Sequence, residues 1–162
     1  MKPYYDEYTI AVTSYLANSG TNIRTQDGVI FQNSRTNILH ITDGTSNTIL
    51  LGERPPSPDL FYGWWYAGVG LRGTGVLDFT INSREQGVRT PYAAYRKCSL
   101  GPYHFEARQV KDYCGVFHYW SLHSGGANFG FCDGSVRFLR YEADAVLPAL
   151  MTRSGGEVAS FE

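Results

Sequence analysis

Residues 127–140, Ala-Asn-Phe-Gly-Phe-Cys-Asp-Gly-Ser-Val-Arg-Phe-Leu-Arg, carry the clearest structural signal of the chain. An Asp-Gly pair between two partly apolar runs is typical of a two-residue type I′ hairpin turn. With Asp-Gly as the loop, Phe131 faces Val136. Phe129 then faces Phe138, so that four apolar side chains share one side of the pair. The segment predicts an antiparallel hairpin whose apolar side meets the core.

Other short runs rich in β-branched, aromatic and apolar residues predict further strands. One strand is expected over residues 8–17, which are followed by the turn residues Asn-Ser-Gly. Two more are expected at residues 38–41 and 48–53, because the polar segment 42–47 between them has turn composition.

The remaining parts of the chain have weaker patterns. Residues 68–113 are rich in Gly, Pro, Arg and Tyr and are expected to be mostly loop, whereas apolar residues at one-turn spacing predict a helix over residues 144–153. The expected fold class is α+β, mainly antiparallel β, with one short C-terminal helix and a long irregular loop region. Because 162 residues is the size of one ordinary domain, a single domain over residues 1–162 is expected.

Composition and charge argue against several kinds of partner. Lys and Arg together number 14 and Asp and Glu 15, so the chain lacks the basic footprint of a protein that binds nucleic acid or anionic lipid. No stretch approaches the roughly eighteen apolar residues of a membrane span, and residues 1–7 lack the apolar region of a signal peptide. We therefore expect no nucleic-acid partner and no membrane span in this chain.

Motifs of the common enzyme classes are missing from the sequence. It contains no G-x-S-x-G elbow, no H-E-x-x-H pair and no P-loop. Residues 68–73 spell G-x-G-x-x-G, but no helix pattern follows, so the phosphate-binding context is absent. The protein is expected not to be an enzyme.

Three blocks of sequence carry a family resemblance. The first is residues 41–53, Ile-Thr-Asp-Gly-Thr-Ser-Asn-Thr-Ile-Leu-Leu-Gly-Glu. The second, residues 123–134, separates a histidine from an Asp-Gly pair by nine residues, and the third is residues 146–158. In this order they resemble a large family of bacterial prepilin-like proteins of undefined function, the DUF1559 type. The residues that match its H-x9-DG signature are His123, Asp133 and Gly134.

The resemblance implies a pilin- or pseudopilin-like globular head that lies outside the cytoplasm, on the cell surface or secreted. Its implied role is non-catalytic: a pilus or type II secretion subunit that forms homo-oligomers or filaments, or assembles with other pseudopilins. Members typically begin with a prepilin peptidase site and a long apolar helix, neither of which this sequence contains. The family is also labelled solute-binding, so the alternative is an envelope module that binds a solute or glycan.

The residues that could bind metal also have simpler roles. The resemblance to pseudopilins makes Asp133, with Asp43, a candidate for a calcium site, although an Asp-Gly turn explains Asp133 without metal. No other cofactor is expected. His123 is expected to fix its loop by hydrogen bonds to the backbone rather than to bind metal. A zinc site could use the cysteines and histidines Cys114, His118, His123 and Cys132, which are residue types that bind zinc. Their spacing in the sequence, however, matches no standard zinc finger.

Cysteine and aromatic residues supply the last candidates. In an exported protein, Cys98 and Cys114 are expected to form a disulfide, which leaves Cys132 as a small apolar residue. Residues 61–66, Phe-Tyr-Gly-Trp-Trp-Tyr, place aromatics on both faces of any strand there. They form either core or an exposed contact for a ligand or a neighbouring subunit. The candidate contact residues are Tyr62, Trp64, Trp65 and Tyr66.

Overall fold

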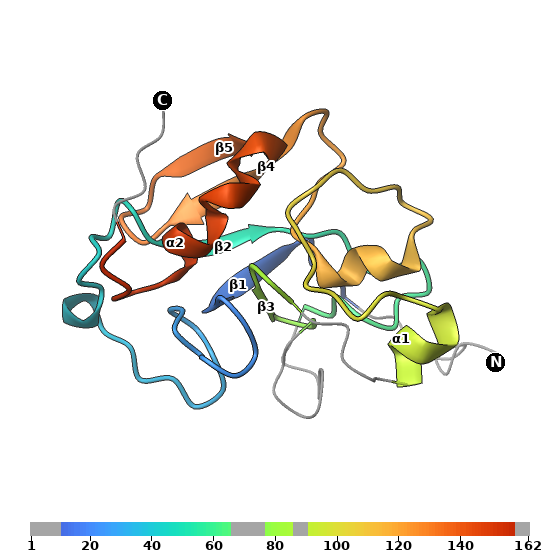
Figure 1. The fold of residues 1–162 in the computed structure, drawn as a ribbon, viewed down its shortest axis with the longest axis horizontal. Coiled ribbons are helices and arrows are strands. Elements are labelled where there is room, and N and C mark those ends of the chain that lie inside the picture. The colour runs from blue at the N-terminus through green and yellow to red at the C-terminus, as the bar shows by residue number, and fades with distance from the viewer. Residues whose placement is uncertain (1–10, 66–76, 86–90, 158–162) are drawn as a thin grey trace.

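The computed structural model describes residues 11–65, 77–85 and 91–157 (Figure 1). Within these ranges a five-stranded mixed sheet has the order β3-β1-β2-β4-β5, in which only β1 and β3 are parallel. The expected α+β class, mainly antiparallel, is confirmed. The strands are β1 (Tyr15–Gly20), β2 (Ile49–Glu53), β3 (Thr80–Asn82), β4 (Gly126–Phe131) and β5 (Val136–Arg140). The helices are α1 (Pro91–Arg96), α2 (Leu147–Met151) and the 3₁₀-helices η1 (Ile38–His40), η3 (Tyr113–Phe117) and η4 (Tyr141–Ala145).

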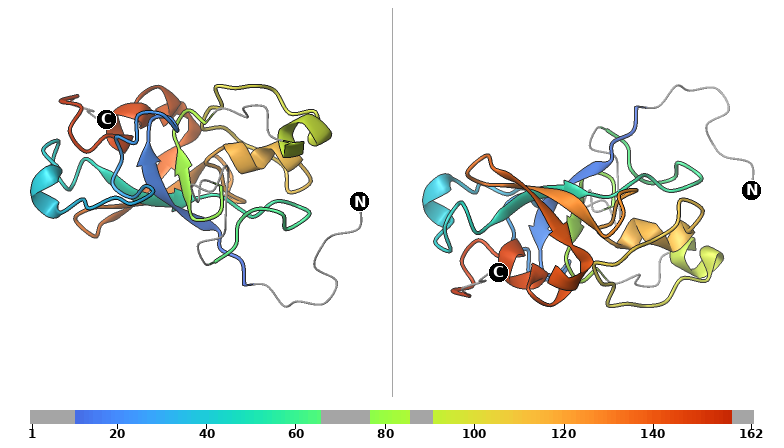
Figure 2. Two further views of the ribbon diagram at one scale, coloured as in Figure 1. Left: turned by 90° about the horizontal axis from the view of Figure 1, so that it is seen from below. Right: turned by 90° about the horizontal axis from the view of Figure 1, so that it is seen from above.

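One face of the sheet packs against the helices. Leu16 of β1 and Phe129 of β4 are fully buried there, together with Leu147 and Leu150 of α2. Figure 2 shows α2 and the segment around α1 on the same side of the sheet. Burying a side chain of this kind stabilises the fold by about 1.5–3 kcal/mol. No helix in the described ranges has the length and apolar character needed to cross a membrane.

Two of the three strands expected in the first part of the chain differ in the structure. The strand expected at 8–17 is described only from residue 11, and it begins at Tyr15 and runs on to Gly20. Residues 38–41 are not a strand, because Ile38–His40 form η1. Asn37 caps this turn: its side chain accepts the Leu39 N–H, and its backbone N–H donates to the His40 ring. The strand expected at 48–53 is confirmed as β2.

The irregular region and the C-terminal helix also differ in detail. β3 and α1 lie within the expected loop region, and β3 forms because its three residues pair with β1. The expected helix is divided into η4 and α2, with Pro148 in the first turn of α2. Proline is tolerated in a first turn because the N–H there has no helical partner.

The hairpin of β4 and β5 exists, but its predicted register is wrong by one residue. Phe131 pairs across a three-residue loop with Ser135, and Gly134 adopts φ +87° at the end of that loop. Phe129 therefore faces Arg137, and Phe138 faces Asn128. A shift of one residue moves alternate side chains to the opposite face. Phe129 and Phe131 stay in the core, whereas Val136 and Phe138 face away from it.

Candidate interaction surface

The face of the sheet opposite α2, here called the outer face, carries two rows of side chains that run across β1, β2, β4 and β5. Both rows follow from the strand register, because directly paired residues share a face. The first row consists of Tyr15, Glu53, Asn128 and Phe138, and the second of Ala17, Leu51, Gly130 and Val136. No described helix or strand packs on these rows.

Much of the outer face is apolar and open to solvent. Val136 is 71% exposed, and Tyr15 and Phe138 are each 46% exposed. Leu51 lies over Gly130, where a Cβ would come within 3.3 Å of the Leu51 Cδ1. A side chain at position 130 would therefore crowd Leu51, and the glycine leaves room for it.

A polar cluster lies at one end of the outer face. The Tyr15 hydroxyl donates to Glu53 Oε1 at 3.0 Å, and the Asn128 N–H donates to Glu53 Oε2 at 2.6 Å. His123 Nε2 lies 3.6 Å from Glu53 Oε1, and its ring meets Phe138 edge-on at a centroid distance of 6.3 Å. Burial raises the pKa of Tyr15, and its hydrogen bond to Glu53 adds to the rise.

This cluster gives the signature histidine a different place from the expected one. Its imidazole contacts the Glu53 carboxylate, not the backbone of its own loop; the local bond is made by the His123 backbone N–H, which donates to Ser121 Oγ. Glu53 ends the first resemblance block and His123 opens the second. The two blocks therefore meet on the outer face, which their separation of 70 positions in the sequence conceals.

A second apolar element lies at the end of the molecule drawn at the left of Figure 1. The 3₁₀-helix η1 exposes 67% of Ile38 and 83% of Leu39, and the capping bonds of Asn37 and His40 hold the turn. We call Ile38 and Leu39 the apolar knob. The strand expected at residues 38–41 concealed them. The sequence signal for the turn is Asn37, followed three residues later by His40, whose side chain can complete a capping box.

The two calcium candidates are occupied by local hydrogen bonds. Asp43 accepts the Gly155 and Gly156 N–H groups at 2.6 and 3.0 Å, which ties down the C-terminal segment. Asp133 accepts the Ser135 N–H at 2.9 Å within the hairpin loop. In the described ranges no group of three or more His, Cys, Asp or Glu side chains is placed to hold a metal ion. Calcium binding stays a prediction that no contact here supports.

Cys98 and Cys114 form the expected disulfide, with their Cα atoms 5.5 Å apart. The bond joins the end of α1 to η3. Because Cys114 is oxidised, the zinc set that included it is wrong. Cys132 is a free, half-buried cysteine, and burial raises its pKa to about 11.

The aromatic segment at 61–66 does not form an exposed row. Tyr62 is buried, Trp64 is half-buried and donates its Nε1–H to the Leu60 carbonyl, and Trp65 is 69% exposed. Tyr66 lies outside the described residues. The segment contributes one isolated bridge, between Val12 and Trp64, and so the candidates are divided between core and surface.

Together, the fold and its surfaces define a disulfide-bonded α+β protein. One face of its sheet packs against helices, and among the described residues no helix or strand covers the other face. The chain belongs to the family described as "Protein of unknown function (DUF1559)", whose model matches residues 1–145. The expected DUF1559 family is thus confirmed, whereas the prepilin-like placement stays a prediction. Neither the curated proteins nor the solved structures contain a match to this chain.

Proposed function

We propose that this protein is a non-catalytic, pseudopilin-like or pilus-like subunit that works outside the cytoplasm through self-assembly. The outer face carries the proposal, because it leaves Val136 and Phe138 exposed on an open sheet with no described element to cover them. Exposed apolar side chains grouped on one surface are typical of interaction sites. Placement among prepilin-like proteins rests on the H-x9-DG resemblance described above.

Two further features support this assignment. The Cys98–Cys114 disulfide suits an oxidising compartment, since cytosolic thiols are kept reduced. A formal net charge of −1 gives copies of the chain little mutual repulsion, so apolar contact between them is weakly opposed.

The occupant of the outer face that we propose is the apolar knob of a second copy. Ile38 and Leu39 are both strongly exposed, and Leu39 is the more exposed of the two. A contact between two different surfaces of the same chain repeats from copy to copy, and it builds a filament when the rotation does not close a ring. Burying each knob residue contributes about 1.5–3 kcal/mol before the cost of association.

The alternative, a solute- or glycan-binding module built on residues 61–66, is supported less well. Of its aromatic side chains in the described part, only Phe61 and Trp65 are well exposed, at 49% and 69%. Alanine at Trp65 is the corresponding test: loss of binding to a glycan array with an unchanged unfolding midpoint would favour this alternative.

Sedimentation velocity over a concentration series tests the proposed assembly. Val136→Lys places a charge on the outer face, and the expected result is a dissociation constant at least about tenfold higher than that of the unmodified protein. Val110→Lys is the matched control, because Val110 is similarly exposed, at 61%, but lies in the segment before η3. Equal weakening by both substitutions, or a protein that stays monomeric at every concentration, would refute the proposal.

A further inference from the structure

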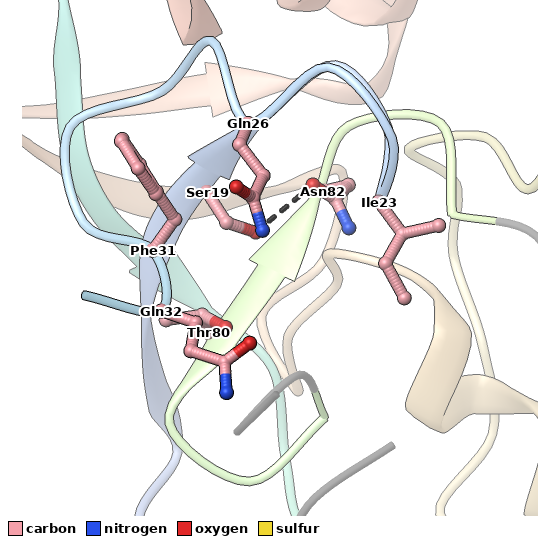
Figure 3. A pocket seen from close by; sticks show the side chains of 7 residues that line it. All are labelled: Ser19, Ile23, Gln26, Phe31, Gln32, Thr80 and Asn82. Atoms are coloured by element: carbon pink, nitrogen blue, oxygen red, sulfur yellow. Dashed lines mark hydrogen bonds between the residues drawn. The ribbon is translucent and has the colours of Figure 1, made fainter. Parts of the chain in front are cut away.

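The two edges of the sheet differ in how well they are protected. The edge formed by β3 has only three residues, and all of them are buried. The loop after β1 lies beside this strand, where Ser19 Oγ donates to Asn82 Oδ1 at 2.9 Å (Figure 3). Short strands and covering loops usually protect a sheet edge against pairing with another chain. The β3 edge is therefore closed to a further strand.

The opposite edge is β5, drawn at the upper rim of the sheet in Figure 1. At one end of its ladder with β4 the Phe131 N–H donates to the Ser135 carbonyl, and at the other the Tyr141 N–H donates to the Gly125 carbonyl. Hydrogen-bonded pairs occupy every second position of an antiparallel ladder. The backbone N–H and C=O groups that point away from β4 are therefore those of Val136, Phe138 and Arg140.

The outward groups of β5 are open. Val136, Phe138 and Arg140 are all exposed, and among the described residues no group donates to or accepts from their outward backbone atoms. The strand contains no proline, and its register with β4 continues through five pairs without a shift. The bulges and prolines that commonly protect an edge strand are thus missing from β5.

The charge of this edge is positive. β5 contains Arg137 and Arg140 but no acidic residue, and neither arginine forms an ion pair in the described part of the chain. The Arg137 guanidinium lies over the Phe131 ring, 4.3 Å from its centroid, and so folds back over its own hairpin. Because side chains alternate along a strand, Arg140 lies on the outer face and Arg137 on the face that packs against the helices.

We propose that the edge of β5 binds an extended, acidic segment of another protein, which adds a strand to the sheet. Main-chain hydrogen bonds supply the affinity of such strand addition, and the two arginines select for carboxylates. The β5 strand of a second copy fits less well, because it brings two more arginines beside these two. The inference goes beyond the assembly proposed above, since the edge binds through backbone groups in the plane of the sheet. An added strand would also widen the outer face, to which β5 contributes Val136 and Phe138.

Fluorescence anisotropy with two synthetic peptides of about eight residues tests the charge preference. One peptide alternates Glu with Val, and the other alternates Lys with Val. Such a peptide has all its charges on one face, and each face of β5 carries one arginine, so the acidic peptide meets a cation in either orientation. We expect it to bind at least about tenfold more tightly than the basic peptide. Arg140→Glu should reduce this preference at least about threefold more than Arg24→Glu, the matched control at an exposed position in the loop after β1.

Val136→Pro tests the backbone contact. It removes an outward N–H, and proline is tolerated at the first residue of an edge strand. Val136→Thr is the matched control, because it keeps the N–H and changes only the side chain. We expect Val136→Pro to weaken binding of the acidic peptide at least about fivefold and Val136→Thr to change it by less than about twofold.

Amide exchange followed by NMR locates the bound peptide. The N–H groups of Phe138 and Arg140 should exchange more slowly when the acidic peptide is bound. Those of Arg137 and Leu139 face β4 and should be slow with or without the peptide.

The inference is overturned if neither peptide binds, if both bind equally, or if Val136→Pro binds the acidic peptide as well as the unmodified protein does. Equal losses with Val136→Pro and Val136→Thr would also overturn it, because the contact would then be made by the side chain on the outer face. Protection of the Phe138 and Arg140 amides that rises with protein concentration, with no peptide present, would identify β5 of a second copy as the occupant and contradict the acidic partner.

Discussion

His118 makes the stability of the fold sensitive to acid. Its side chain is 1% exposed and lies beside η3, where Nδ1 is 2.6 Å from the His104 carbonyl. Nε2 is buried without a hydrogen-bond partner in the described part of the chain. Desolvation lowers the pKa of His118 to about 4, against a weaker opposing effect of the bond to His104. The folded protein therefore holds this imidazole neutral, with its Nδ1–H donated to the carbonyl.

The sign and size of the effect follow from linkage. The unfolded chain has an ordinary histidine pKa near 6.5, so between about pH 6.5 and 4 it binds more protons than the folded chain at this residue. The stabilising contribution is present in full above pH 6.5 and is lost as the pH falls toward 4. The difference between a pKa near 6.5 in the unfolded chain and about 4 in the folded chain corresponds to about 3 kcal/mol of unfolding free energy.

Urea unfolding at a series of pH values measures this loss. In His118→Asn the amide nitrogen takes the place of Nδ1 as donor to the His104 carbonyl, but the side chain does not titrate. We expect this variant to be less stable than the unmodified protein at pH 7 and to lose about 3 kcal/mol less on acidification to pH 4. Leu122→Asn, at an exposed position that does not titrate in either form, is the control and should leave the pH profile unchanged. Parallel profiles for His118→Asn and the unmodified protein would refute the reasoning.

Two further substitutions test the internal links of the fold. Asn18 Nδ2 donates to the Ile49 and Met151 carbonyls at 2.7 and 2.8 Å. Asn18→Leu should therefore lower the unfolding free energy by about 3 kcal/mol, because both carbonyls lose their donor. A loss below about 1 kcal/mol in urea unfolding would contradict this role. Replacing both Cys98 and Cys114 by alanine should lower the free energy of unfolding by about 3 kcal/mol, because the disulfide joins residues 16 positions apart. The unfolding midpoint of this double variant should not respond to reductant.

The hairpin shows both how far the sequence predicts this fold and where it fails. The Asp-Gly pair correctly located the turn, because Gly134 adopts the positive φ that such turns require. It did not distinguish a two-residue loop from a three-residue loop. The longer loop is supported by Asp133, which accepts hydrogen bonds from both the N–H and the hydroxyl of Ser135. That one-residue difference turned Val136 from an expected core residue into an exposed one.

Contacts between distant segments were beyond the reach of sequence patterns. Glu53 and His123 meet only because β2 pairs with β4, and no periodicity within either segment reports that pairing. The same limit applies to β3, which is recognisable only through its pairing with β1. By contrast, the Cys98–Cys114 bond was predictable, because it joins nearby parts of one irregular region.

Mixing two assembly-deficient variants tests the central claim most directly. Val136→Lys disables the outer face but keeps the apolar knob, and Leu39→Lys disables the knob but keeps the face. If the knob of one copy binds the face of the next, each variant alone is monomeric. An equimolar mixture then forms a heterodimer that grows no further, which native mass spectrometry resolves by mass. A mixture that stays monomeric, or Leu39→Lys protein that assembles as well as the unmodified chain, would contradict the account.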